Sequence, residues 1–161
     1  MFPTAPQFKS HLTEILTRNT RLPVREIKSG EKVSPNNIYI LPPNRSMLIK
    51  RGVLRLAALG HKAGWHNPID SFFCSLAADQ KKNAVGVLLS GEGSDGTAGL
   101  QAIKAGGGTT FAQSEETATH LSMPHSAVVS GHVDFILSPA EIGGRLGYAP
   151  HGGDRSQDRP R

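Results

Sequence analysis

The chain has 161 residues, 37% of them hydrophobic, which suits one globular domain with a single buried core. No apolar run approaches the roughly 20 residues of a membrane span, and the N-terminus lacks the basic and then apolar regions of a signal peptide. We therefore expect a cytoplasmic protein without membrane insertion. The single cysteine, Cys74, excludes an internal disulfide and a cysteine-based zinc site, and we interpret it as a buried packing residue. Neither a cofactor nor a metal is expected.

The net charge of +5 is unevenly distributed along the chain. Residues 1–62 carry 11 basic and 3 acidic side chains, whereas residues 63–144 carry 3 basic and 8 acidic ones. A basic half can bind nucleic acid, an acidic protein or neither. Because no basic residues cluster with aromatic ones and no recognition-helix or RNA-binding motif is present, nucleic acid is not an expected partner.

The first half of the chain predicts two helices around a small strand-rich insertion. Apolar residues at helical spacing predict a helix over Gln7–Asn19, and Pro68 suits the first turn of another that runs to about Lys82. Between them, short apolar runs are separated by turn residues, and Arg51-Gly52 is typical of a tight hairpin turn. The predicted strands are Val24–Ile27, Ile38–Leu41, Met47–Ile49 and Val53–Leu56.

From Ala84 onward, predicted strands and helices alternate. Such alternation implies a parallel sheet with helices on its faces, an α/β fold of the doubly wound, Rossmann-like three-layer type. The string Ser138-Pro139-Ala140-Glu141 has the form of a capping box. We expect residues 1–147 to form one domain and residues 148–161 to be a disordered tail. The predicted elements are Ala84–Leu89, Thr97–Ala105, Thr109–Gln113, Pro124–Ser130, Val133–Leu137 and Pro139–Leu146.

The stretch VLLSGEGSDGTAGL, residues 87–100, contains glycines in the spacing G-x-G-x-x-G. One interpretation is a dinucleotide-binding turn, because Glu115 lies 20 residues beyond Asp95, about where a ribose hydroxyl would need an acid. Three observations disfavour it. The dinucleotide fingerprint normally opens its domain, whereas the strand before these glycines follows 83 other residues. Glu92 and Asp95 add negative charge where a pyrophosphate would approach, and no lysine follows the glycines as in a P-loop.

A second interpretation makes this stretch a loop that presents Asp95. Open α/β sheets place their active sites at the carboxyl ends of parallel strands, where this loop would lie. A purely structural interpretation makes Asp95 the N-cap of the helix that begins at Thr97. The two roles are compatible.

Several segments together resemble one enzyme family. The strings NAVGVLLSGEGSDGTAGLQAIKAGGGTTFAQ and SMPHSAVVSGHVDFILSP resemble the catalytic domain of CheB-type protein-glutamate methylesterases, especially versions found in hybrids with the chemotaxis methyltransferase. RLPVREIKSGEKVSPNNIYILPPN resembles the hairpin region of that family, and NPIDSFFCSLA resembles its next helix. The resemblance covers about residues 6–146.

This resemblance implies an activity and a mechanism. The family hydrolyses glutamate methyl esters on chemoreceptors, many members also deamidate receptor glutamines, and the machinery is a Ser-His-Asp triad. Asp95 falls on the family's aspartate, which orients the histidine and stabilises its imidazolium. Backbone N–H groups of glycine-rich loops would stabilise the oxyanion. The resemblance assigns to the substrate and oxyanion region the residues Gly91, Glu92, Gly93, His66 and Met123.

The same resemblance predicts a defect. Aligned without gaps, the family's histidine falls at or near Pro3 and its serine before Met1, so we expect the first strands to be missing and catalysis to be impaired. Glu92 stands where relatives often carry methionine or threonine. The expected partners are the cytoplasmic helices of methyl-accepting chemoreceptors and, in addition, a chemotaxis methyltransferase. The alternative is a non-catalytic receptor-binding or regulatory remnant of the family.

Overall fold

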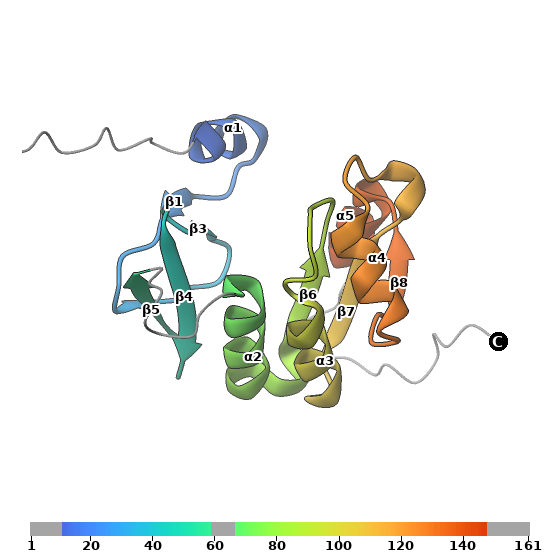
Figure 1. Cartoon of the computed structure of the whole chain (residues 1–161). Helices are drawn as coiled ribbons and strands as arrows, with labels where there is room; N and C mark the ends of the chain where they lie inside the picture. The colour runs from blue at the N-terminus through green and yellow to red at the C-terminus, as the bar shows by residue number, and fades with distance from the viewer. Residues whose placement is uncertain (1–10, 59–66, 148–161) are drawn as a thin grey trace, which may run out of the picture.

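The computed structural model describes residues 11–58 and 67–147 (Figure 1). Its helices are α1 (His11–Asn19), α2 (Pro68–Gln80), α3 (Thr97–Ala105), α4 (Ser122–Val129) and α5 (Pro139–Gly147), with short 3-10 helices η1 (Lys81–Asn83) and η2 (Glu115–Thr117). Its strands are β1 (Val24–Glu26), β2 (Glu31–Lys32), β3 (Ile38–Ile40), β4 (Arg45–Lys50), β5 (Val53–Ala58), β6 (Val85–Leu88), β7 (Thr109–Gln113) and β8 (Phe135–Leu137). None of the helices in these ranges has the length and hydrophobicity that a membrane-spanning segment requires.

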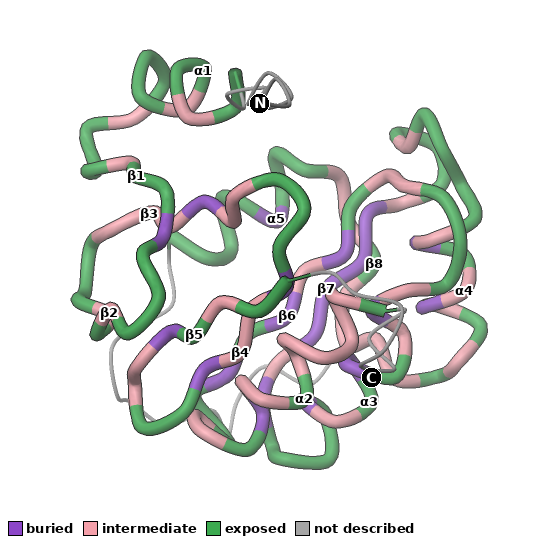
Figure 2. The backbone as a smooth tube through the Cα atoms, turned by 60° about the vertical axis from the view of Figure 1, so that its left-hand side comes forward, coloured by how far each residue is buried: buried purple, intermediate pink, exposed green. Residues whose placement is uncertain are grey.

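The second half of the chain forms a parallel sheet in the order β6-β7-β8. The central strand β7 is buried from Thr110 to Gln113 because it has a neighbour on each side and helices on both faces. On one face, Leu88 and Ala112 pack against Leu100 of α3 and Ala127 of α4. The buried backbone positions accordingly gather along β6 and β7 (Figure 2).

Helix α5 covers the opposite face of this sheet. Side chains alternate along a strand, so Phe111 points away from the face on which Ala112 packs. The Phe111 ring stacks on Phe135 of β8, and the Arg145 guanidinium of α5 lies 4.0 Å from the centre of the Phe135 ring. The expected doubly wound arrangement is therefore confirmed.

The first half of the chain is built around an antiparallel hairpin of β4 and β5, to which β2 adds. Arg51 and Gly52 form its turn with φ values of 53° and 70°, the left-handed pair that a tight two-residue turn requires. The hairpin turn predicted at Arg51-Gly52 is thus confirmed. Residues 21–44, which resemble the hairpin region of the family, instead contain β1 and β3, which pair parallel to each other.

Helix α2 joins the two halves, and Figure 1 shows it between the hairpin and β6. One of its faces, with Phe72 and Leu76, packs on the hairpin core, while Phe73 packs toward the parallel sheet. Cys74 is exposed, so our interpretation of it as a buried residue was wrong. Partial burial, followed by the charge of Asp70, raises the pKa of its thiol.

Near its C-terminal end, α2 is fastened to the hairpin turn by Asp79. This carboxylate accepts hydrogen bonds from the backbone N–H groups of Arg51 and Gly52, the latter at 3.0 Å. The side chain of Gln80 also donates to it, at 2.7 Å, and together these donors lower the pKa of Asp79, the Gln80 bond contributing most.

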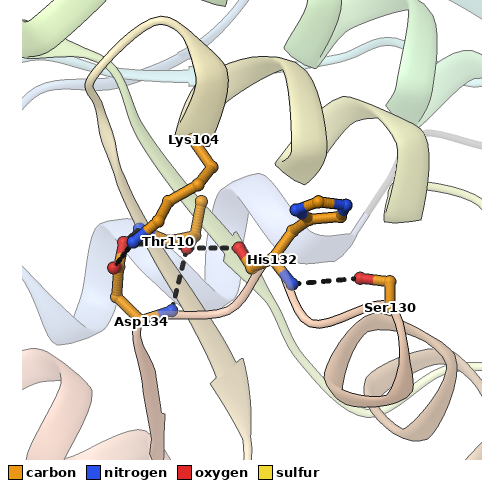
Figure 3. Close-up of polar contacts among 5 residues, drawn as sticks. All are labelled: Lys104, Thr110, Ser130, His132 and Asp134. Carbon is orange, nitrogen blue, oxygen red and sulfur yellow. Dashed lines mark hydrogen bonds and ion pairs between the residues drawn. The ribbon is translucent and has the colours of Figure 1, made fainter.

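Strands β7 and β8 are fastened together at their amino ends by Asp134 (Figure 3). Its Oδ2 accepts a hydrogen bond from the N–H of the fully buried Thr110 at 3.0 Å and lies at the same distance from the Thr110 hydroxyl oxygen, while its Oδ1 forms an ion pair with Lys104. The Thr110 hydroxyl donates to the His132 carbonyl oxygen at 2.7 Å. Burial raises the pKa of Asp134, but the bonds from Lys104 and Thr110 outweigh burial and lower it overall. This cluster lies at the end of the sheet opposite the glycine-containing loop.

Candidate active site

Asp95 lies on the loop between β6 and α3, at the carboxyl end of β6. Its side chain reaches across to the first turn of α2, where Oδ2 accepts the N–H of Ile69 at 3.0 Å and Oδ1 accepts that of Asp70 at 2.9 Å. The two bonds use one oxygen each, so they fix the plane of the carboxylate. Each oxygen keeps a further lone pair with which it can accept another donor.

The first turn of α2 requires such an acceptor. Pro68 has no N–H, and the side chain of the preceding Asn67 does not cap the helix. The Ser71 N–H is satisfied by the Asn67 carbonyl oxygen at 3.1 Å, which leaves those of Ile69 and Asp70 for Asp95. The positive end of the helix dipole also favours a carboxylate at this place.

Asp95 is therefore a helix cap, but of a different helix from the one we predicted. The N-cap of α3 is Gly96, with a φ of 97° and no side-chain cap. Asp95 instead caps α2, whose first turn lies 25 and 26 residues earlier in the chain. The acidic side chain of that turn, Asp70, in return accepts the N–H of Gly99 in α3 at 2.7 Å.

The glycine-containing loop is bound to His120 and to the first turn of α4. The Gly91 N–H donates to the His120 carbonyl oxygen and the Met123 N–H to the Gly91 carbonyl oxygen, both at 3.1 Å. The Gly93 N–H donates to the Ser122 hydroxyl at 3.0 Å. A Cβ at Gly91 would lie 2.9 Å from the Met123 sulfur, so the flexible end of the Met123 side chain would have to move to admit one.

Four of the five predicted substrate-region residues thus lie together. Gly91, Gly93 and Met123 meet through the bonds between their two segments, and Glu92 projects from the same loop into solvent. The exposed Glu92 carboxylate lies 3.6 Å from Nδ1 of His120. The fifth predicted residue, His66, lies outside the described residues.

Ser90 and Gln113 complete the support of this loop, and the sequence analysis did not single out Gln113. The Gln113 side chain is buried at the end of β7, accepts the Ser90 N–H at 2.8 Å and donates to the Thr117 carbonyl oxygen at 2.9 Å. Ser90 Oγ accepts the His120 N–H at 2.8 Å. A polar side chain at the end of an otherwise apolar strand was the available signal for Gln113.

This bonding pattern does not suit a dinucleotide. A phosphate needs free N–H groups in the turn, but those of Ser90, Gly91 and Gly93 already have partners within the protein. Glu115, the candidate ribose ligand, lies 2.6 Å from Nδ1 of His125. In the two described ranges, no group of three or more His, Cys, Asp or Glu side chains could hold a metal ion.

Within residues 11–58 and 67–147, Asp95 has no histidine partner, although its carboxylate could accept one. Three of the histidines in these ranges lie beside glutamates: His11 beside Glu14, His120 beside Glu92 and His125 beside Glu115. The hydrogen bonds to Asp95 come from the backbone of Ile69 and Asp70. What this part of the chain assembles is an oriented carboxylate beside a glycine loop.

A doubly wound parallel sheet with this carboxylate at its carboxyl edge defines an α/β domain whose site lies where such sheets place their active sites. The family model for CheB methylesterase matches residues 2–146. The chain belongs to the CheB methylesterase family.

Individual relatives agree with the family match. The chain is 37% identical over 145 residues to protein-glutamate methylesterase/protein-glutamine glutaminase 3 of Burkholderia lata, covering 88% of this chain and 40% of that protein. It is 36% identical to a 104.1 kDa protein of Rhodobacter capsulatus, over 82% of this chain and 14% of the relative. The chain thus spans less than half the length of these curated relatives. The crystal structure of the Thermotoga maritima CheB methylesterase catalytic domain matches with a TM-score of 0.76 and 29% identity, over 89% of this chain and 78% of that one.

Proposed function

We propose that this chain supplies the acidic part of a protein-glutamate methylesterase site, with Asp95 as the aspartate of a Ser-His-Asp triad. The observation that carries the proposal is the carboxylate held by two α2 N–H groups beside the glycine loop. An aspartate in such a triad holds the imidazole in the correct tautomer and stabilises the imidazolium, so a fixed orientation matters more than its basicity. The family match and the methylesterase names of the relatives support this assignment.

The chemistry is acyl transfer to water. A serine attacks the carbonyl carbon of the glutamate methyl ester, and a histidine takes its proton and passes it to the leaving methanol. Water then hydrolyses the acyl-enzyme and restores the glutamate carboxylate. Deamidation of a glutamine side chain follows the same steps with ammonia as the leaving group. The glycine loop with Glu92 would border the oxyanion, and His66, two residues before Pro68 of α2, belongs to the same proposed substrate region.

We further propose that the chain as given is impaired as an esterase. The motivation is that the hydrogen bonds to Asp95 in the described ranges come from backbone N–H groups rather than a histidine. Loss of any triad member costs several orders of magnitude in rate. The exposed Glu92 adds negative charge beside the oxyanion region, which would disfavour an anionic intermediate.

The proposed partners are the cytoplasmic helices of methyl-accepting chemoreceptors, so the proposed compartment is the cytoplasm. Lys50, Arg51 and Arg55 line an open hollow of about 680 Å³ between the β4–β5 hairpin and α2, with Asp79 at its side. Most of the protein's basic residues lie in this first half, which suits acidic receptor surfaces. A chemotaxis methyltransferase is the second proposed partner.

The deciding experiment measures methanol release from methylated receptor together with binding of the same receptor. We expect binding that weakens with salt and turnover near background. Turnover that Asp95→Asn abolishes would support the role of Asp95 and contradict the impairment. Binding that persists in Asp95→Ala, with no detectable turnover by either that variant or the unsubstituted chain, would favour the alternative of a non-catalytic receptor-binding module. If the chain neither binds the receptor nor releases methanol from it, the proposed function is refuted.

A further inference from the structure

We propose that Asp70 is a positioning residue for Asp95, and that the two aspartates hold each other through a reciprocal cap of two helices. The inference rests on the proposed role of Asp95 in the site. Asp70 takes part in both halves of the cap. Its N–H donates to Asp95 Oδ1, and its own Oδ1 accepts the N–H of Gly99 in the first turn of α3.

The two bonds close a loop between the helix starts. Asp95 immediately precedes Gly96, the N-cap of α3, and Gly99 lies four residues beyond Asp95. When Asp70 binds Gly99, it fixes the first turn of α3 against the first turn of α2, and so fixes the end of the loop that carries Asp95. The bond lengths of 2.7 to 3.0 Å on both sides are those of hydrogen bonds to charged acceptors.

All four carboxylate oxygens of Asp70 and Asp95 accept hydrogen bonds. Asp95 accepts two backbone N–H groups. Asp70 accepts the backbone N–H of Gly99 and, at 3.2 Å, a hydrogen bond from the side-chain amide of Asn67. Both carboxylates also lie at the amino ends of helices, where the dipole favours negative charge. Neither oxygen pair is left without a donor.

Close approach of the two helices depends on Gly99. A Cβ at this position would lie 2.4 Å from Cβ of Phe73 and 3.2 Å from Cα of Asp70. Without a side chain there, the backbone N–H of Gly99 comes within reach of the Asp70 carboxylate. The position of Asp95 relative to α2 thus depends on the contacts of Gly99 in α3 with Asp70 and Phe73 in α2, as well as on the loop that carries Asp95.

The test uses the chain as it is and needs no substrate. Amide hydrogen exchange and amide proton shifts are measured by NMR in Asp70→Ala, Asp70→Asn and the control Asp79→Ala. Asp79 is a matched control because it also lies on α2 and also caps two backbone N–H groups, but at the other end of the helix.

In Asp70→Ala we expect exchange of the Gly99 amide to accelerate about tenfold. We also expect exchange of the Ile69 amide to accelerate at least threefold, with an upfield shift of its proton as the Asp95 carboxylate moves away. The Asn side chain of Asp70→Asn keeps an oxygen for Gly99, so both changes should be smaller and in the same proportion. Asp79→Ala should alter the exchange of the hairpin turn and leave Ile69 and Gly99 within about twofold of the wild type after correction for global stability.

The proposal is overturned if Asp70→Ala frees Gly99 while the Ile69 amide keeps its shift and exchange rate, because the two caps would then be independent. It is also overturned if Asp79→Ala moves Ile69 as much, because the effect would then be general loosening of α2. If Asp70→Ala does not fold, Asp70→Asn decides between the same outcomes. A chain that neither binds methylated receptor nor releases methanol from it would refute the proposed function while leaving these amide signals, and hence this inference, in place.

Discussion

The contact of Gly99 with α2 permits a prediction whose sign depends on which of two effects is larger. Alanine is favoured over glycine inside a helix by about 1 kcal/mol, so helix propensity alone predicts that Gly99→Ala stabilises the protein. The added methyl carbon, however, would lie 2.4 Å from Cβ of Phe73, whereas nonbonded carbons prefer 3.5 to 4.0 Å. Because Phe73 Cβ is fixed to its backbone, α2 itself would have to move by roughly 1 Å.

That movement has two costs. Overpacking a well-packed contact destabilises by about 1 to 3 kcal/mol, and the Asp70–Gly99 hydrogen bond would lengthen from 2.7 Å, at a cost of about 1 kcal/mol more. We expect a net loss of about 2 kcal/mol in the free energy of unfolding after the gain in propensity is included. The assay is urea unfolding followed by far-ultraviolet circular dichroism.

Gly144→Ala is the matched control. Gly144 is also inside a helix, α5, but nothing lies within 4 Å of a Cβ built there. It should gain up to about 1 kcal/mol from propensity alone. If Gly99→Ala proves as stable as Gly144→Ala, the packing argument, and with it the close approach that the reciprocal cap requires, is refuted.

Three further predictions concern side chains away from that contact. The folded pKa of Asp134 is lowered below its usual 3.8, so the stability that its carboxylate contributes is fully present above that value and is lost as pH falls through the folded pKa. Asp134→Asn should therefore destabilise the protein at about pH 7 and make little difference at about pH 2. Equal shifts of the urea unfolding midpoint at both pH values would contradict this expectation. The Cys74 thiol should react with a thiol reagent in the folded protein, but more slowly than a free thiol, because burial raises its pKa; no reaction before unfolding would contradict its exposure. Ser138→Ala should lower the free energy of unfolding by about 1 kcal/mol and raise the pKa of Glu141, which the hydrogen bonds from Ser138 now lower. An unchanged NMR titration of Glu141 would contradict the capping box.

Local signals predicted much of the fold. The alternation of strands and helices after Ala84 is confirmed, with α4 beginning two residues earlier than predicted and β8 two residues later. The capping box at Ser138 is confirmed by its N–H bond to Glu141 Oε2 at 2.8 Å. These features are encoded within a few neighbouring residues, as apolar periodicity or as paired side chains of one helical turn.

Features that depend on distant contacts were not predicted. Strand β2 has two residues, Glu31 and Lys32, and exists only because β5 offers it an edge. The parallel pairing of β1 and β3 likewise carries no local signal. The site shows the same limit, since the glycine pattern indicated that Asp95 is presented by a loop, but its cap on a helix 25 residues earlier arises from packing.

Helix α2 has 13 residues, so it is about 20 Å long, and near each end an aspartate carboxylate bonds it to another part of the fold. Asp79 ties its C-terminal end to the hairpin turn, and Asp95 meets its first turn beside the glycine loop. Because a helix is stiff over this length, a tilt imposed at its C-terminal end also moves its first turn. A partner that displaces the β4–β5 hairpin would therefore also tilt the first turn of α2 and change the orientation of the Asp95 carboxylate, so binding at the hairpin would be coupled to the alignment of Asp95 through one helix.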